Sequence, residues 1–428
     1  MKTYLKSIII TLLVFILIFL KDSLPLSNNT FQKKMDNNLP VLTGLDILEK
    51  NNFSILKGKK VGLITNQTGL NQKLIQNIEL FFNSSDVDLK AIFSPEHGLS
   101  GTENAGKKLF SKKHIDYEIP VFSLYGKTRK PNPEMLNGIE VLVFDIQDIG
   151  IRSYTYISTM GLAMEAAAEN DIEFIVLDRP NPIGGERIEG NLLERDFKSF
   201  IGMYPIPYVH SLTIGELAYL INNSGWLEAG QCDLTIIKMK NWSRGINFLA
   251  TGRQWIPTSP HVPEAITPYF MIATGVLGEL GIFSNGVGYT APFQYIAAPW
   301  INAEKISSRL NELDIQGIVF RPIKYKPYYG LYENEFVEGV QILFTDISKV
   351  NLLSIQFHFL EIHHNLYPEK DPFLMTTKQK LRMFDKAMGT DKVRKLFSKR
   401  FKYSDIELIL NQDLPNFLSK TKIIRFYE

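Results

Sequence analysis

The stretch Val141–Gly150, VLVFDIQDIG, decides the fold. It begins as an apolar run, interrupted only by Asp145, and then turns polar at Gln147 and Asp148. A short, nearly continuous apolar run of this kind is typical of a strand buried on both faces of a parallel sheet. Side chains that directly follow such a strand lie at the carboxyl edge of the sheet, where open α/β folds bind their ligands.

The same pattern recurs along the first half of the chain. Further apolar runs, each followed by turn residues, occupy 61–64, 89–93, 121–124 and 174–177. Helical stretches at about 72–82 and 158–170 separate some of these runs. Apolar runs alternating with helices predict a parallel sheet covered on both faces. We therefore predict an α/β domain with a Rossmann-like open parallel sheet over residues 41–262.

The pattern changes after the proline-rich segment 257–263. The periodicity there predicts two strands and four helices, at 317–321, 339–344, 302–313, 349–366, 376–388 and 391–400. Strands followed by a run of helices are typical of an α+β arrangement. We predict a second, smaller α+β auxiliary domain over residues 263–428.

The first 26 residues have the features of an export signal. Lys2 and Lys6 precede an apolar run, 8–20, which is too short to cross the ~30 Å hydrocarbon core of a bilayer as a helix. No small-x-small cleavage site follows, so residues 1–26 are either a cleaved signal or an uncleaved N-terminal anchor, and 27–40 is a polar linker. We expect a periplasmic or extracellular protein, free or tethered by this segment.

Composition excludes several classes of protein. With 45% hydrophobic and 21% charged residues, the 428-residue chain has enough apolar material for a large core and is not disordered. Its net charge of +2 gives no reason to expect a nucleic-acid partner. The single cysteine, Cys232, precludes an internal disulfide and is expected to be a buried structural residue.

Polar side chains follow five of the predicted strands and should meet at one edge of the sheet. They are Asn66, Glu96 with His97, Tyr125, Asp145 with Asp148, and Asp178 with Arg179. Any one of them could simply mark a loop, but their repetition at strand ends favours an active site there.

The absence of standard motifs narrows the chemistry. The sequence contains no G-x-G-x-x-G, no phosphate-binding P-loop, no G-x-S-x-G and no H-E-x-x-H. Glu96, His97 and Asp145 would be the candidate metal ligands, but we predict no metal and no cofactor. Carboxylates remain, and they point to general acid–base catalysis, above all to glycoside hydrolysis.

Glu96 is the leading candidate for a general acid. It lies in the bend Pro95–Gly98, where a strand-end carboxyl group can be held partly buried, and burial favours the protonated form that an acid needs. His97 could tune it. Asp145 and Asp148 are the alternatives for a second carboxylate, and either could instead pair with Arg152.

Other polar and aromatic residues are candidates for substrate binding. Arg152 and Arg179 could hold a substrate carboxylate with two hydrogen bonds, and tyrosines could stack on a sugar. The residues that we expect to bind substrate are Asn66, Tyr125, Arg152, Tyr154, Asp178, Arg179, Asn181 and Tyr289.

Long strings of this sequence resemble a known family. They are 61-VGLITNQTG-69, 94-SPEHG-98, 125-YGKTRKP-131, 144-FDIQDIGIRSYTY-156, 177-LDRPNPIGG-185, 284-SNGVGYT-290 and 298-APW-300. On these strings the chain resembles the NamZ-like exo-β-N-acetylmuramidases over nearly everything after the linker. Asn285 and Ala297 depart from the family pattern, where Glu and Gly are expected, and this leaves a sugar contact near Asn285 in doubt.

The resemblance implies a specific activity. It implies release of terminal N-acetylmuramic acid from the non-reducing end of peptidoglycan fragments, in a cleft between a Rossmann-like domain and an auxiliary domain. The glutamate of the Pro-Glu-His-Gly motif, which is Glu96 here, would be catalytic. The expected partners are peptidoglycan-derived muramyl saccharides, with no obligate protein partner.

Two rival functions stay open at this point. The first is a non-catalytic protein that binds peptidoglycan fragments in the same cleft. The second is a hydrolase with a serine nucleophile, Ser94 or Ser153, which the lack of a nucleophile elbow disfavours. The sequence also leaves open whether the reaction retains or inverts the anomeric centre, or uses the substrate's own acetamido group as nucleophile.

Overall fold

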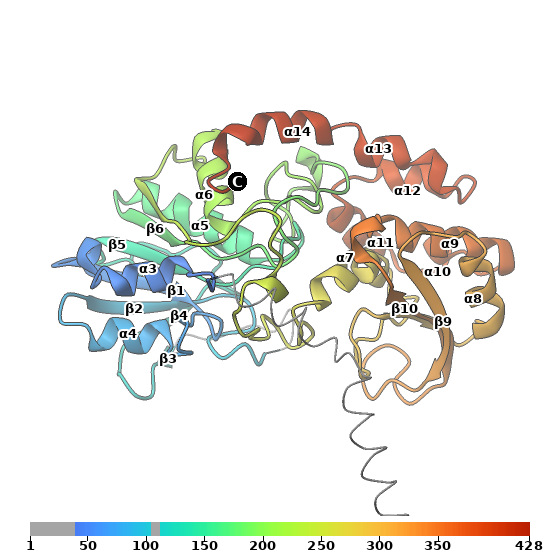
Figure 1. Ribbon diagram of the computed structural model, residues 1–428, viewed down its shortest axis with the longest axis horizontal. Coiled ribbons are helices and arrows are strands. Elements are labelled where there is room, and N and C mark those ends of the chain that lie inside the picture. Colours follow the sequence, from blue (N-terminus) through green and yellow to red (C-terminus); the bar gives the residue numbers. More distant parts are fainter. Residues whose placement is uncertain (1–38, 104–111) are drawn as a thin grey trace, which may run out of the picture. The chain divides into compact units, whose positions relative to one another are not determined.

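The computed structural model describes residues 39–103 and 112–428 (Figure 1). The chain divides into two units, Met1–Pro40 and Val41–Glu428, and all helices and strands named below belong to the second. The predicted leader, 1–26, and the linker up to residue 38 lie outside the described residues. Among the described residues, no helix has both the length and the apolar character needed to cross a membrane.

A seven-stranded sheet occupies the first half of the second unit, within the described ranges (Figure 1). Its strands are β1 Lys60–Thr65, β2 Asp88–Ser94, β3 Lys112–Lys113, β4 Pro120–Ser123, β5 Val141–Asp145, β6 Glu173–Leu177 and β7 Leu234–Ile237. The parallel strands stand in the order β4-β2-β1-β5-β6-β7, and β3 pairs antiparallel with β4 at the edge. This is the Rossmann strand order, so the predicted fold is confirmed.

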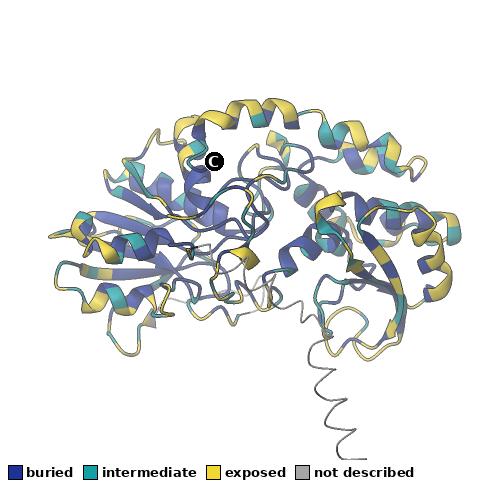
Figure 2. Cartoon of the chain, viewed as in Figure 1, coloured by how far each residue is buried: buried dark blue, intermediate teal, exposed yellow. Residues whose placement is uncertain are grey.

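Helices cover both faces of this sheet. On one face, the helices α3 Gly44–Lys50 and α4 Asn77–Asn83 pack against apolar side chains of β1, β2, β5 and β6. The helices α5 Tyr156–Glu169 and α6 Ile214–Asn223 share a second apolar cluster with the alternate side chains of the same strands. Burial on both faces explains why the strands are continuous apolar runs and do not alternate with polar residues (Figure 2).

The second half of the unit contains a three-stranded antiparallel sheet in the order β8-β10-β9, again within the described ranges. Its strands are β8 Tyr295–Ala298, β9 Ile318–Tyr325 and β10 Val337–Phe344. Its helices are α7 Thr267–Gly278, α8 Ala303–Asn311, α9 Ser354–Leu366, α10 Pro372–Met375, α11 Lys378–Met388, α12 Lys392–Phe397, α13 Glu407–Asn411 and α14 Leu414–Thr421. Strands and helices in this order agree with the predicted α+β character. The domain boundary at residue 262 stays a prediction.

One predicted helix begins later than the sequence pattern indicated. A helix was expected from about residue 72, but α4 begins at Asn77. The side chain of Asn71 accepts hydrogen bonds from the backbone amides of Lys73 and Ile75, and Leu74 has a positive φ of 62°. A local side-chain turn therefore replaces the first helical turn.

The end of the chain returns to the first sheet. After α14, the Tyr427 hydroxyl donates to the Asp178 carboxylate at 2.5 Å, and the Phe426 amide donates to Glu216 at 2.9 Å. Figure 1 shows this C-terminal end beside α6. The contact ties the last residues to the carboxyl end of β6, near the edge where the sequence places the active site.

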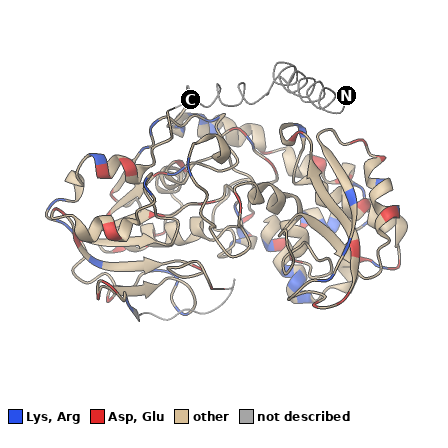
Figure 3. Ribbon diagram, turned by 60° about the horizontal axis from the view of Figure 1, so that its bottom comes forward, with Lys and Arg blue, Asp and Glu red and all other residues tan. Residues whose placement is uncertain are grey.

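Charged residues of both signs are spread over the described part of the protein (Figure 3). This distribution agrees with the net charge of +2.

Candidate active site

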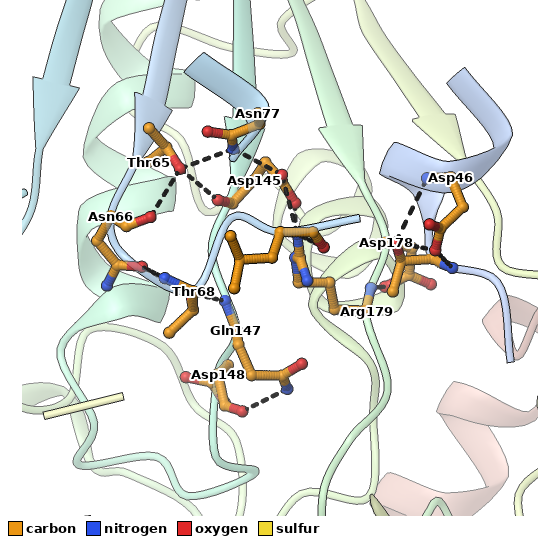
Figure 4. Close-up of polar contacts among 12 residues, drawn as sticks. Asp46, Thr65, Asn66, Thr68, Asn77, Asp145, Gln147, Asp148, Asp178 and Arg179 are labelled. Carbon is orange, nitrogen blue, oxygen red and sulfur yellow. Dashed lines mark hydrogen bonds and ion pairs between the residues drawn. The ribbon is translucent and has the colours of Figure 1, made fainter. Parts of the chain in front are cut away.

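The strand order reverses between β1 and β5, and this is where an open α/β sheet forms a crevice at its carboxyl edge. The segment Asn66–Thr68 follows β1, and Gln147 and Asp148 follow β5. The Gln147 amide donates to the Thr68 hydroxyl at 2.9 Å, which joins the two loops across the reversal (Figure 4). The sequence-predicted edge and the topological crevice therefore coincide.

Asn66 holds the loop after β1 in place. Its Oδ1 accepts from the Thr68 amide at 3.0 Å and from the Thr68 hydroxyl at 2.6 Å (Figure 4). Its Nδ2 donates to the Tyr156 hydroxyl at 3.0 Å. Asn66 is buried and both ends of its amide are engaged, so it shapes the crevice through its neighbours.

Glu96 and His97 lie in a tight turn directly after β2. The turn is closed by a hydrogen bond from the Gly98 amide to the Pro95 carbonyl at 3.1 Å, and His97 adopts a φ of 69°. This left-handed conformation costs a non-glycine residue roughly 1 kcal/mol and is often found at functional sites. The His97 Nδ1 donates to the Glu103 carbonyl at 2.6 Å, which fixes the ring.

The Glu96 carboxylate points toward the start of α5. It accepts a hydrogen bond from the Thr155 hydroxyl at 2.7 Å, and the side chain is only 7% exposed. It also lies close to Tyr156, whose pKa is raised by burial first and further by the neighbouring Tyr154 and Glu96. Glu96 is therefore held in a buried polar group with Asn66 and Tyr156.

Two tyrosines bring a distant segment over this polar group. The Tyr154 hydroxyl donates to the Thr258 hydroxyl at 2.8 Å, and the Tyr156 hydroxyl donates to the Thr258 carbonyl at 2.6 Å. The Gln67 amide donates to the Pro257 carbonyl at 2.7 Å. Gln67, Thr155 and Thr258 were not predicted as site residues, and only the proline-rich character of 257–263 drew attention to that segment.

Asp148 is a buried carboxyl group with an unusual environment. Its Oδ2 accepts from the Gly150 amide at 2.8 Å, while Oδ1 has no hydrogen-bond partner among the described residues. Burial raises the pKa of Asp148 to about 7, although the backbone amides of Gly150 and Ile149 act in the opposite direction. Asp148 therefore changes its charge close to neutral pH, as catalytic carboxyl groups often do.

Asp145 is fully engaged in a buried ion pair. Its Oδ1 accepts from the Arg179 Nε at 2.6 Å, and its Oδ2 accepts from the Arg179 Nη2 at 2.9 Å and from the Asn77 Nδ2 at 2.7 Å (Figure 4). Neither side chain is more than 4% exposed. Of the two predicted alternatives for a second catalytic carboxylate, only Asp148 has an oxygen without a partner in the described structure.

Arg152 is not brought to the crevice, contrary to the expectation that it could bind a substrate carboxylate. Its Nη1 donates to the carbonyls of Asn191 and Ile206, and its Nη2 donates to those of Ala387 and Met388, at 2.7–3.0 Å. The side chain is 2% exposed, and burial lowers its pKa to about 10. Its position indicates that Arg152 joins the end of α11 to the first half of the unit.

Asp178 and Asn181 also lie in structural networks. Asp178 accepts from the Thr213 hydroxyl at 2.9 Å, the Gly215 amide at 2.8 Å and the Tyr427 hydroxyl, and burial raises its pKa to about 7. The Asn181 Nδ2 donates to the Leu212 carbonyl at 3.0 Å, and its Oδ1 accepts from the Ile183 amide. Neither is part of the hydrogen-bonded group around Asn66.

The two remaining predicted tyrosines lie in other surroundings. Tyr125, after β4, lies 5.8 Å from the Phe200 ring, and the Arg129 guanidinium sits 5.7 Å from its ring centre. Tyr289 stacks on Tyr325 at 4.6 Å, in a cluster of tyrosines on the antiparallel sheet. Of the three tyrosines predicted to bind substrate, Tyr154 therefore belongs to the polar group around Asn66 and Glu96, and Tyr125 and Tyr289 do not.

A cavity of about 230 Å³ opens beside the strand reversal. It is lined by Thr68, Gln147 and Arg179, which follow strands of the sheet, and by Arg253 and Trp255, which precede the segment 257–263. The cavity stops short of Glu96, which is not among its lining residues. In the part of the chain that the structure describes, no three His, Cys, Asp or Glu side chains form a group that could hold a metal ion.

Comparison with known proteins decides the family. The model described as "Exo-beta-N-acetylmuramidase NamZ, N-terminal" matches residues 61–266, and the corresponding C-terminal model matches residues 270–427. The chain belongs to the NamZ family. Peptidoglycan β-N-acetylmuramidase NamZ from Bacillus subtilis strain 168 is 42% identical over 354 residues, which is 83% of each chain.

Two solved structures share this NamZ-family fold. Both are crystal structures of DUF1343 family proteins from Bacteroides fragilis NCTC 9343. One has a TM-score of 0.87 and 46% identity, and the other a TM-score of 0.70 and 26% identity. Each comparison covers 91% of this chain and 99% of the other. The predicted resemblance to the NamZ-like enzymes is therefore confirmed.

Proposed function

We propose that this chain is an exo-acting glycoside hydrolase that releases N-acetylmuramic acid from the non-reducing end of peptidoglycan fragments, with Glu96 as its general acid. Membership of the NamZ family supplies the reaction class, since its family models and its Bacillus subtilis relative are named as β-N-acetylmuramidases. The observation that carries the choice of acid is the strained turn at His97, which holds the buried Glu96 carboxyl group at the carboxyl edge beside the strand reversal.

Glu96 would protonate the glycosidic oxygen as the bond to the leaving sugar breaks. A general acid must be within hydrogen-bond reach of the oxygen that it protonates, and such a group typically contributes 10²–10⁴-fold to the rate. The Thr155 hydroxyl orients the carboxyl group by donating to one of its oxygens. His97 acts on Glu96 by fixing the turn.

Asp148 is the second carboxyl group of this proposal. Cleavage of a glycosidic bond develops positive charge on the sugar ring, and an ionised carboxylate stabilises that charge. The Asp148 Oδ1 has no competing partner in the described structure, and the group ionises near pH 7. Asp145 instead forms an ion pair with Arg179.

Arg179 provides the contact that distinguishes muramic acid from glucosamine. Its bonds to Asp145 use Nε and Nη2, and its guanidinium group borders the 230 Å³ cavity. Nη1 has no partner among the described residues and is available to the lactyl carboxylate of the substrate. A charge-assisted hydrogen bond of this kind is typically worth about 1.5–3 kcal/mol.

A simple experiment tests the proposal against a protein that only binds fragments. The purified chain is incubated with a disaccharide that carries N-acetylmuramic acid at its non-reducing end. We expect N-acetylmuramic acid and the second monosaccharide in equal amounts. Saturable binding of the disaccharide with no release of either product would instead support a muropeptide-binding protein.

We further propose that the protein works outside the cytoplasm, where peptidoglycan lies. The support is the basic, then apolar, segment at residues 1–26. Fractionation of cells that produce the full chain should place it in the periplasm, the medium or the outer face of the membrane. Recovery of the full chain from the cytosol alone would contradict this.

A further inference from the structure

Tyr329 lies on an exposed aromatic loop between β9 and β10. The Tyr329 side chain is 51% exposed, and its neighbours Tyr328 and Phe336 are 66% and 59% exposed. Large aromatic side chains left in water on a monomer commonly mark a binding surface. The tyrosines of this loop played no part in the predicted site.

The loop is held rigidly. The Tyr328 amide donates to the Gly288 carbonyl at 2.7 Å, and the Asn334 amide donates to the Pro327 carbonyl at 2.9 Å. Gly288 has a φ of 92°, and a Cβ atom there would lie 2.0 Å from the Tyr329 carbonyl oxygen. Such close packing holds the backbone at Tyr329, and a group that is already held loses little freedom when it binds a ligand.

The segment 257–263 connects Tyr329 with the polar group around Glu96. The Tyr329 hydroxyl is hydrogen-bonded to the His261 Nε2 at 2.9 Å, and the two rings are 6.1 Å apart at an angle of 28°. His261 belongs to the same proline-rich segment, 257–263, that contacts Tyr154 and Tyr156. Burial first, and then the charge of His97, lower the pKa of His261.

We propose that Tyr329, positioned by His261, is the stacking platform for the sugar on the leaving-group side of the scissile bond. This inference rests on the proposed function. An apolar face of a pyranose ring matches an exposed tyrosine ring, and the ring hydroxyls match the polar groups around it.

The position of Glu96 decides which sugar of the substrate stacks on Tyr329. The acid must reach the glycosidic oxygen, so the leaving sugar begins at Glu96. The terminal N-acetylmuramic acid occupies the crevice at the strand reversal, with Asp148 and Arg179. Tyr156, in the polar group of Glu96, donates to Thr258, and the same segment carries His261, which bonds the half-exposed Tyr329. An exo-acting enzyme needs an open side for the rest of the glycan, and a half-exposed ring provides it.

The test compares substrates with and without a sugar leaving group. We would measure kcat/KM for the muramyl disaccharide and for N-acetylmuramyl fluoride, whose leaving group has no ring. Stacking that removes about 50 Å² of apolar surface from water corresponds to roughly a tenfold change in affinity. Tyr329→Ala should therefore lower kcat/KM about tenfold on the disaccharide, mainly through KM, and less than about twofold on the fluoride. Tyr329→Phe keeps the ring but loses the hydrogen bond to His261, so its kcat/KM on the disaccharide should lie between those of Tyr329→Ala and the parent.

Tyr328→Ala is the matched control, because Tyr328 lies in the same loop but its ring faces Tyr289 at 5.4 Å. It should leave both values within about twofold of the parent. Equal losses on both substrates in Tyr329→Ala, or no loss on either, would overturn the platform.

A binding measurement separates the platform from the proposed reaction. In a Glu96→Gln background, Tyr329→Ala should raise the Kd of the disaccharide about tenfold and leave that of free N-acetylmuramic acid unchanged. Failure of the parent to hydrolyse either substrate would overturn the proposed function, while the Kd values would still decide the role of Tyr329. An unchanged disaccharide Kd would overturn the platform alone.

Discussion

Replacing Asp148 by Asn should change how the stability of the protein depends on pH. Burial raises the pKa of this carboxyl group from 3.8 to about 7 in the folded state. The folded protein therefore holds the proton more tightly than the unfolded chain. The stabilisation from Asp148 is fully present below about pH 4 and is lost as the pH rises to about 7. At about 1.4 kcal/mol per pKa unit, the loss approaches roughly 4 kcal/mol.

Asparagine has no proton to lose, so Asp148→Asn should escape this loss. We would measure the free energy of unfolding by urea at pH 4.5 and pH 8 for both proteins. The variant should gain on the parent by a few kcal/mol between the two pH values, with roughly 4 kcal/mol as the upper limit. A difference between variant and parent that is the same at both pH values would refute the assignment of an elevated pKa to Asp148.

Asp145→Asn is the matched control, with the same chemical change on the same strand end. It leaves the buried Arg179 guanidinium without its carboxylate, which typically costs about 3–5 kcal/mol. We expect that loss at both pH values. Parental stability in Asp145→Asn would contradict a structural role for the Asp145–Arg179 pair.

Three further predictions concern activity. The kcat/KM of the parent should rise with pH up to about 7, because Asp148 must ionise to stabilise positive charge. Asp148→Asn should lack this rise, and a rise that persists in the variant would belong to another group. The double variant Asp145→Asn/Arg179→Met, which removes both members of the buried ion pair, should have a kcat/KM roughly 10–150-fold below that of the parent on a muramyl glycoside and much closer to that of the parent on the glucosaminyl analogue. Equal losses on both would exclude carboxylate recognition by Arg179. Arg152→Met should lower the free energy of unfolding without changing the preference for the muramyl substrate. An altered preference would show that Arg152 takes part in substrate binding.

The fold could be read from the sequence because burial on both faces of a parallel sheet leaves a clear pattern. The runs at 61–64 and 141–146 became β1 and β5, and the polar residues after them meet at the strand reversal. Strand ends of a parallel sheet share one edge whatever the details of the loops. The position of Glu96, Asp148 and Asn66 at this edge therefore followed from local patterns alone.

The roles of the arginines could not be read in this way. Arg152 follows the same strand end as Asp148, but its side chain binds carbonyls at positions 191, 206, 387 and 388. No local pattern reports contacts so distant in the chain. Arg179 was expected at the edge and lies there, yet its pairing with Asp145 depends on the alignment of β5 beside β6.

The contribution of Thr258 was missed for a related reason. It lies in an irregular proline-rich segment with no periodicity, and it reaches the site through hydroxyl groups of Tyr154 and Tyr156. Tyr154 was predicted to bind substrate through its ring, and no local pattern indicated that the two hydroxyl groups would contact Thr258. Only the fold shows that their polar ends meet one residue about a hundred positions away.

In the proposed reaction, Glu96 supplies the proton for release of N-acetylmuramic acid. The most direct measurement is the rate at which Glu96→Gln releases this sugar from the muramyl disaccharide, relative to the parent. The variant is nearly isosteric and lacks only the transferable proton, so it should bind the disaccharide and turn it over 10²–10⁴-fold more slowly, a range of roughly this size being typical of a lost general acid. Turnover within about threefold of the parent would contradict the assignment of Glu96 as the acid.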